Sequence, residues 1–204
     1  MKRTIIIAAL GVLALSCETE ETVINNIPQD NLVDNIALTG KLRRMVQSPA
    51  AIDNMIDGSS CFAINFPFTV TVNTQEVNVS SESDYQEVRD ILNASYGDED
   101  IVEIQFPVTV TYIDYTEATF STQSQFNQAV AGCTGSIELS CVNLAYPLSV
   151  KSYNSQNQLA QTISLGSKRA VFDFLKNMAS YDAVSLNYPI VFNAPDGSTL
   201  TLGS

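Results

Sequence analysis

Four copies of one strand-like segment constrain this chain more than any other feature. Each copy has an aromatic residue, then a proline, then an apolar residue. The four prolines are Pro67, Pro107, Pro147 and Pro189, which lie 40, 40 and 42 residues apart. A fixed period of this length is typical of repeat proteins, in which each unit must share its apolar face with a neighbour. We interpret residues 61–204 as four repeats with these bounds: 61–100, 101–140, 141–182 and an incomplete 183–204.

Each repeat predicts the order strand, strand, helix. The proline segments alternate apolar and polar residues, which is typical of strands, and proline marks an edge, a bulge or a bend. A second alternating run follows in each repeat, at 76–79, 118–120, 162–165 and 199–202. In the first three repeats the apolar period then becomes helical. Serines that precede these helical runs are expected N-caps, and they are Ser83, Ser124 and Ser167.

The predicted fold class is α+β, with antiparallel sheet and helices on one face. The alternative is a pair of tandem β-sandwich modules of about 80 residues each. The fourth repeat reaches Gly203 and Ser204 where its helix is expected to begin. We therefore expect the chain to be a fragment of a longer protein.

The N-terminus has the features of an export signal. Lys2 and Arg3 precede an apolar run at 5–15, which is shorter than the roughly 20 residues that a membrane span requires. A charged start followed by a short apolar run is typical of a signal peptide. Ser16 and Cys17 follow this run, and a small residue before a cysteine at the end of an apolar run resembles a bacterial lipobox. The expectation is a lipoprotein signal peptide at 1–16 and a lipidated Cys17; an ordinary signal peptide is the alternative.

The segment after Cys17 predicts a tether. Residues 17–40 are polar and acidic at the start, which favours a flexible linker. Glu18, Glu20 and Glu21 resemble the surface-export signal of Bacteroidota lipoproteins, which implies an outer-membrane protein that faces outward. A simple solvated tether is the alternative. Residues 41–60 predict a short helical lead-in that is broken near Pro49.

Composition excludes several classes of function. The formal net charge is -12, which disfavours binding to nucleic-acid phosphates. The chain has no histidine, so Ser-His and Cys-His nucleophile pairs and histidine metal ligands are absent. Phosphate-binding glycine loops and nucleophile-elbow motifs are also missing. The sequence therefore nominates no catalytic residue, no metal ligand and no cofactor.

Three cysteines remain after Cys17. Cys133 and Cys141 are eight residues apart across an expected turn, so a disulfide between them is predicted. Cys61 then lacks a partner, and its partner is expected beyond Ser204. A zinc site is a weaker alternative because the chain has no Cys-x-x-Cys pair.

The aromatic residues before the prolines are candidates for a binding surface. Phe66 and Phe106 are expected in the core. Tyr146 and Tyr188 carry hydroxyls that need a partner or water, so they suit either the core or a ligand-binding face. We take these two tyrosines as the candidate binding residues.

The whole chain, 1–204, resembles a group of uncharacterised Bacteroidota surface lipoproteins, especially flavobacterial ones. The matching pieces are 53–57 (Asp-Asn-Met-Ile-Asp), Cys61 with Phe62, and the four proline segments. The resemblance implies a lipid-anchored outer-membrane protein and supplies no activity. We expect a non-catalytic display or binding module whose partner is a glycan or an envelope protein. The alternatives are a carboxylate-dependent envelope hydrolase and a spacer for a missing C-terminal domain.

Overall fold

The computed structural model describes residues 31–94, 99–135, 138–139, 142–156 and 158–203. Within these ranges it is a mixed α+β structure, so the predicted fold class is confirmed. Four antiparallel sheets of three strands each are formed, in the orders β1-β5-β6, β3-β2-β4, β10-β8-β9 and β12-β11-β7.

The elements follow the predicted repeat. The strands are β1 (Phe62–Ile64), β2 (Phe68–Val72), β3 (Gln75–Val79), β4 (Val102–Ile104), β5 (Val108–Tyr112), β6 (Glu117–Phe120), β7 (Asn143–Leu144), β8 (Leu148–Tyr153), β9 (Leu159–Leu165), β10 (Ala183–Leu186), β11 (Ile190–Asn193) and β12 (Thr199–Leu202). The helices are α1 (Ile36–Met45), α2 (Asn54–Asp57), η1 (Glu82–Asp84), α3 (Tyr85–Leu92), α4 (Gln123–Ala131), α5 (Lys168–Asn177) and η2 (Met178–Ser180). β12 is the last element in the part of the chain that the structure describes.

Each proline segment forms two strands rather than the single strand that alternation predicts. A cis peptide bond precedes each of the four prolines. The strand before the proline and the strand after it belong to different sheets. Proline cannot donate to a strand ladder, so the position between two sheets is one that it can occupy.

The strands that precede the prolines are exchanged between neighbouring repeats. β1 of repeat 1 pairs with β5 of repeat 2, and β4 of repeat 2 pairs with β2 of repeat 1. In the same way β7 pairs with β11, and β10 pairs with β8. Repeats 1 and 2 therefore form one unit, which we call module 1, and repeats 3 and 4 form module 2. The buried apolar side chains divide into two clusters along the same boundary.

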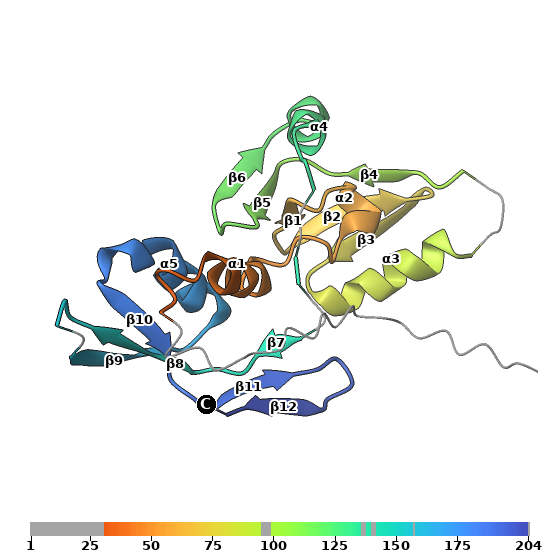
Figure 1. The fold of residues 1–204 in the computed structure, drawn as a ribbon. Helices are drawn as coiled ribbons and strands as arrows, with labels where there is room; N and C mark the ends of the chain where they lie inside the picture. The colour runs from red at the N-terminus through yellow and green to blue at the C-terminus, as the bar shows by residue number, and fades with distance from the viewer. Residues whose placement is uncertain (1–30, 95–98, 136–137, 140–141, 157, 204) are drawn as a thin grey trace, which may run out of the picture.

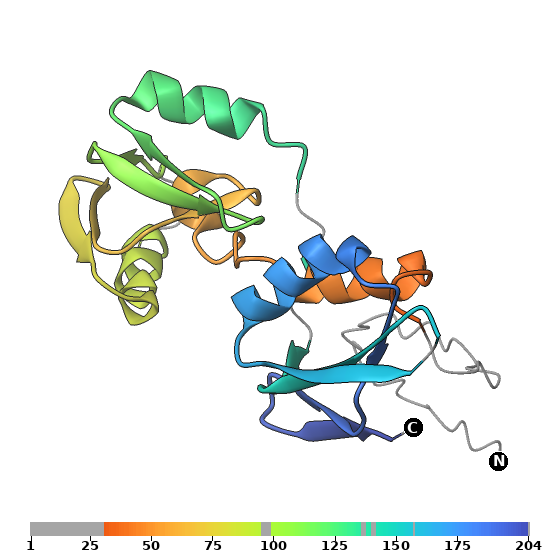
Figure 2. The same ribbon diagram turned by 90° about the vertical axis from the view of Figure 1, so that its left-hand side faces the viewer.

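The two modules lie side by side, module 1 in yellow and green and module 2 in blue (Figure 1). This division into two modules is the one that the sandwich alternative predicts, whereas the helices follow the main prediction. In module 1, α3 packs on β2 and β3, and α4 packs on β6. In module 2, α5 and α1 lie on one side of strands β8 and β9, and the β11–β12 hairpin lies on the other (Figure 2).

Two of the three predicted helix caps are displaced by two residues. Ser81 forms a capping box with Asp84, and the Thr122 side chain accepts a hydrogen bond from the Gln125 N–H. Ser83 and Ser124 lie within the first turns instead, so those two predictions are wrong. Ser167 is the N-cap of α5 as predicted, and its hydroxyl accepts from the Ala170 N–H.

The predicted linker at 17–40 is too long. Leu32 is buried in the core of module 2, and its N–H donates to the Val184 carbonyl oxygen over 2.7 Å. α1 then begins at Ile36 and buries Leu42. Residues from 31 onward therefore belong to the fold, because this segment carries apolar side chains that module 2 covers. The signal peptide, Cys17 and the acidic residues that follow it lie outside the described residues.

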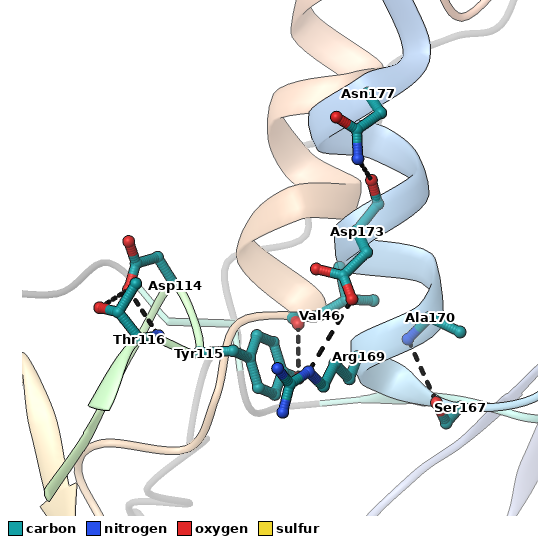
Figure 3. Close-up of polar contacts among 9 residues, drawn as sticks. All are labelled: Val46, Asp114, Tyr115, Thr116, Ser167, Arg169, Ala170, Asp173 and Asn177. Carbon is teal, nitrogen blue, oxygen red and sulfur yellow. Dashed lines mark hydrogen bonds and ion pairs between the residues drawn. The ribbon is translucent and has the colours of Figure 1, made fainter.

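Tyr115 joins the two modules. It lies in the tight turn between β5 and β6 and has a positive φ of 65°. Its hydroxyl donates to the carbonyl oxygen of Val46 over 2.9 Å, and its ring packs against Phe172 of α5 at 5.2 Å between ring centroids. The Arg169 guanidinium lies 5.6 Å from the same ring (Figure 3). A side chain of module 1 is thus anchored in module 2.

Candidate binding site

The two candidate tyrosines come from equivalent turns of repeats 3 and 4. Tyr146 follows β7 and Tyr188 follows β10, each just before its cis-proline. Backbone hydrogen bonds between each turn and the strand that follows the other turn hold the two turns together. The Ala145 N–H donates to the Val191 carbonyl oxygen over 2.8 Å, and the Asn187 N–H donates to that of Ser149 over 2.9 Å.

These turns enclose a depression of about 270 Å³. Its lining residues are Ala145, Tyr146, Pro147, Leu148, Ser149, Asn187, Tyr188, Pro189, Ile190 and Val191. Tyr188 is 37% exposed, whereas Tyr146 is half-buried against the core of module 2. Burial raises the pKa of the Tyr146 phenol above its ordinary value. The structure brings the two tyrosines together, and ligand binding there stays a prediction.

The equivalent aromatic residues of module 1 each contact a ring on a helix. Phe66 is nevertheless 39% exposed, so the prediction that it lies in the core is wrong, whereas Phe106 packs partly buried against the core of module 1. Phe66 lies 5.6 Å from the Tyr85 ring of α3, and Phe106 lies 5.8 Å from the Phe126 ring of α4. Tyr85 and Phe126 are each the fourth residue after the helix N-cap. In α5 the same position is Val171, which has no ring. The helix α5 therefore offers the tyrosine turns of module 2 no aromatic partner at this position.

A second unusual group is a pair of buried carboxyls on α2. Asp53 is fully buried, and its Oδ2 accepts from the Ile64 N–H over 2.7 Å. Asp57 is nearly as buried, and its Oδ1 accepts from the Ser59 N–H over 2.8 Å. Burial raises the pKa of Asp53 to about 6. Burial and the neighbouring Asp53 charge raise the pKa of Asp57 to about 8.

Perturbed carboxyl pairs are typical of catalytic sites, so this pair is the best candidate for the hydrolase alternative. An open depression of about 300 Å³ lies nearby and is lined by Tyr85, Glu82 and Phe66 among others. Neither Asp53 nor Asp57 lines it. Asp53, the N-cap of α2, is instead bonded to the N–H of Ile64, the last residue of β1, which indicates a role in holding α2 against that strand, and Asp57 is bonded to the turn that leads from α2 to β1. In the sequence these aspartates stand out only as part of the motif at 53–57, because nothing in their spacing indicates that they are buried.

The disulfide differs from the prediction. Cys133 is bonded to Cys61, with 5.8 Å between the Cα atoms, so the predicted Cys133–Cys141 bond is wrong. The reason is the strand exchange. Because β1 pairs with β5, the start of β1 lies near the end of α4, where Cys133 follows the helix. The expectation of a Cys61 partner beyond Ser204 is wrong for the same reason, and Cys141 lies outside the described residues.

Neither a candidate metal site nor a candidate membrane span is found among the residues that the structure describes. In these ranges no three or more cysteine or carboxylate side chains are grouped so that they could hold a metal ion. No described helix combines the length and apolar character needed to cross a membrane.

Comparisons with protein-family models, with curated proteins and with solved structures find no match for this chain.

Proposed function

We propose that this protein is anchored to the outer membrane by a lipid on Cys17 and acts, without catalysis, as a surface-exposed binding protein. The N-terminal signal features and the acidic residues after Cys17 support this location. The Cys61–Cys133 disulfide supports export, because such bonds persist mainly in oxidising compartments outside the cytosol.

The pocket between Tyr146 and Tyr188 is the observation that carries the binding role. It combines two aromatic rings with apolar side chains such as Leu148 and Ile190 and with the polar residue Asn187. Interfaces between proteins favour exposed tyrosines surrounded by apolar groups. We therefore favour an envelope protein as the partner.

A glycan is the second candidate ligand. The specific observation in its favour is the pair of tyrosines in one small depression beside Asn187 and Ser149. Aromatic rings offer an apolar face, and the neighbouring polar groups would give hydrogen bonds to sugar hydroxyls.

Labelling with radioactive palmitate tests the anchor. We expect label and membrane association in wild-type cells and loss of both in Cys17→Ser. The matched control is Cys141→Ser, which we expect to keep both. A labelled Cys17→Ser protein would contradict the anchor.

Binding of the lipid-free Cys17→Ser protein to intact cells tests the site. We expect Tyr188→Ala to weaken binding at least about tenfold, since a buried aromatic contact contributes more than 1 kcal/mol. Ile101→Ala is the control, because Ile101 is also an exposed apolar residue but lies in module 1. Protease treatment of the cells should remove binding if the partner is a protein. Periodate treatment should remove it if the partner is a glycan.

A further inference from the structure

We propose that module 1 holds a second binding site, at the turn that carries Phe66, and that its ligand is an uncharged sugar residue of a glycan. The site is the depression of about 300 Å³ that Phe66, Glu82 and Tyr85 line. It shares no lining residue with the depression between Tyr146 and Tyr188 in module 2. The inference therefore goes beyond the proposed function and does not depend on it.

The Phe66 turn has the same sequence pattern and the same backbone anchor as the Tyr188 turn. Asn65 precedes Phe66 and Asn187 precedes Tyr188, whereas repeats 2 and 3 have glutamine and alanine at this position. The Asn65 N–H donates to the Thr109 carbonyl oxygen over 2.8 Å, and the Asn187 N–H makes the equivalent bond in module 2. Phe66 is 39% exposed and Tyr188 is 37% exposed. Each module thus presents one exposed ring beside an open depression.

Phe66 offers an aromatic surface that is fixed in place. Its ring stacks on that of Phe68, with 6.1 Å between centroids and 13° between planes, and lies 5.6 Å from the Tyr85 ring. Phe68 and Tyr85 are both buried, so they hold the Phe66 ring in one orientation. Ile52 lines the same depression and is 37% exposed. Together Phe66 and Ile52 form an apolar surface of the kind against which the C–H face of a sugar ring packs.

Polar groups that can bind hydroxyls line the same depression. The Thr111 hydroxyl donates to Asn65 Oδ1 over 2.6 Å, which fixes the amide. Among the described residues the Asn65 NH₂ group has no acceptor, and the Glu82 carboxylate has no donor. An amide N–H gives a donor and a carboxylate gives an acceptor. A sugar hydroxyl, which both donates and accepts, satisfies both groups.

The walls of the depression come from separate segments that hydrogen bonds hold in place. These segments are the chain before α2, the end of β1 with its turn, η1 with the first residue of α3, and β5. The Ser48 N–H donates to the Ile113 carbonyl oxygen over 3.0 Å. The capping box of Ser81 and Asp84 fixes η1, which carries Glu82. A site that is already formed loses less conformational entropy when a ligand binds.

Charge and volume favour an uncharged sugar over other ligands. Glu82 is the only charged residue among the described residues that line the depression, and the chain has a net charge of -12. An acidic sugar would be repelled and would find no arginine or lysine there to bind it. A volume of about 300 Å³ is at the lower end of the range of small-ligand pockets. It suits a single sugar residue within a chain.

The probe is a printed array of defined uncharged and acidic oligosaccharides, to which the lipid-free Cys17→Ser protein is applied. We expect binding to uncharged glycans and none to acidic ones. Phe66→Ala should weaken binding at least about tenfold, because the aromatic surface is lost. Ile101→Ala is the matched control, since Ile101 is an exposed apolar residue of module 1 that does not line the depression. Absence of binding to every uncharged glycan, or an equal loss in both variants, would overturn the proposal.

Two conservative substitutions test the polar groups. Asn65→Asp keeps an oxygen that accepts from the Thr111 hydroxyl but loses the NH₂ donor, so we expect binding to weaken at least about tenfold. Glu82→Gln removes the charge and should extend binding to acidic glycans. Circular dichroism should show that both variants fold like wild type. Unchanged affinity in Asn65→Asp together with unchanged specificity in Glu82→Gln would overturn the assignment of these groups.

Tyr188→Ala separates this site from the one in module 2. If Phe66→Ala loses glycan binding and Tyr188→Ala keeps it, the sugar site lies in module 1, whatever module 2 binds. If Tyr188→Ala loses glycan binding and Phe66→Ala keeps it, the sugar site lies in module 2. That second result would overturn this proposal and leave the proposed function intact.

Discussion

Asp53 and Asp57 are the described carboxyl groups whose pKa values lie furthest above the ordinary value. In the folded protein their pKa values rise from 3.8 to about 6 and about 8. The native state therefore binds more protons than the unfolded chain between pH 4 and pH 8. Stability falls as pH rises wherever the native state holds the extra protons. These two carboxyls thus make module 1 less stable as pH rises from about 4 to about 8.

We predict that Asp57→Asn flattens this pH dependence. Asparagine keeps an oxygen that accepts from the Ser59 N–H but cannot ionise beside Asp53. At pH 8 the variant should have a free energy of unfolding higher than that of wild type by at least about 1 kcal/mol. Urea unfolding at pH 5 and pH 8 measures it. Asp90→Asn, on the exposed face of α3, is the control, and its free energy of unfolding should change with pH as in wild type. A wild-type pH dependence in Asp57→Asn would contradict the role of Asp57.

Some of the important residues could be predicted from the sequence, and others could not. Tyr146 and Tyr188 could be nominated as a pair because the repeat places them at equivalent positions. The burial of Asp53 could not be predicted, because it depends on α2 packing against β1, and a charged residue in a loop normally stays in solvent.

At the scale of elements, alternation and helical periodicity located the strands and the three repeat helices. They did not predict which strand pairs with which. Alternation specifies the face on which a side chain lies, but it carries no information about whether β1 pairs with its own repeat or with β5. That ambiguity led directly to the wrong partner for Cys133.

The displaced cap of α4 gives a prediction at this scale. Thr122→Ala removes the acceptor for the Gln125 N–H and should lower the free energy of unfolding by about 1 kcal/mol. Ser124→Ala is the control, and we expect a change within about 0.5 kcal/mol because alanine favours helix interiors. Thermal unfolding followed by circular dichroism compares the two. A larger loss of stability in Ser124→Ala than in Thr122→Ala would contradict Thr122 as the N-cap and favour Ser124 instead.

The disulfide gives a second prediction. Cys61–Cys133 closes a loop across 72 residues, so Cys133→Ser should destabilise module 1 by about 2–4 kcal/mol. Cys141→Ser should have little effect on stability. Non-reducing peptide mapping by mass spectrometry identifies the bond, and a peptide that joins Cys133 to Cys141 would contradict the structure.

At the scale of the whole molecule, Tyr115 links the two modules. We predict that Tyr115→Ala removes the ring contact with Phe172 and the hydrogen bond to Val46, and that the modules then unfold independently. Differential scanning calorimetry should show one transition in wild type and two in the variant. Tyr112→Ala removes a tyrosine that packs on Phe62 within module 1, so it should lower stability without separating the transitions.

In the proposed function the two modules lie at the cell surface, with a lipid anchor at Cys17 and a binding site on module 2. Protease shaving of intact cells tests this placement most directly, with wild type compared to Cys17→Ser. We predict that the wild-type protein is digested while a periplasmic marker survives, and that the cell-associated Cys17→Ser protein is protected. Protection of the wild-type protein would contradict surface exposure and direct the search for partners to the periplasm.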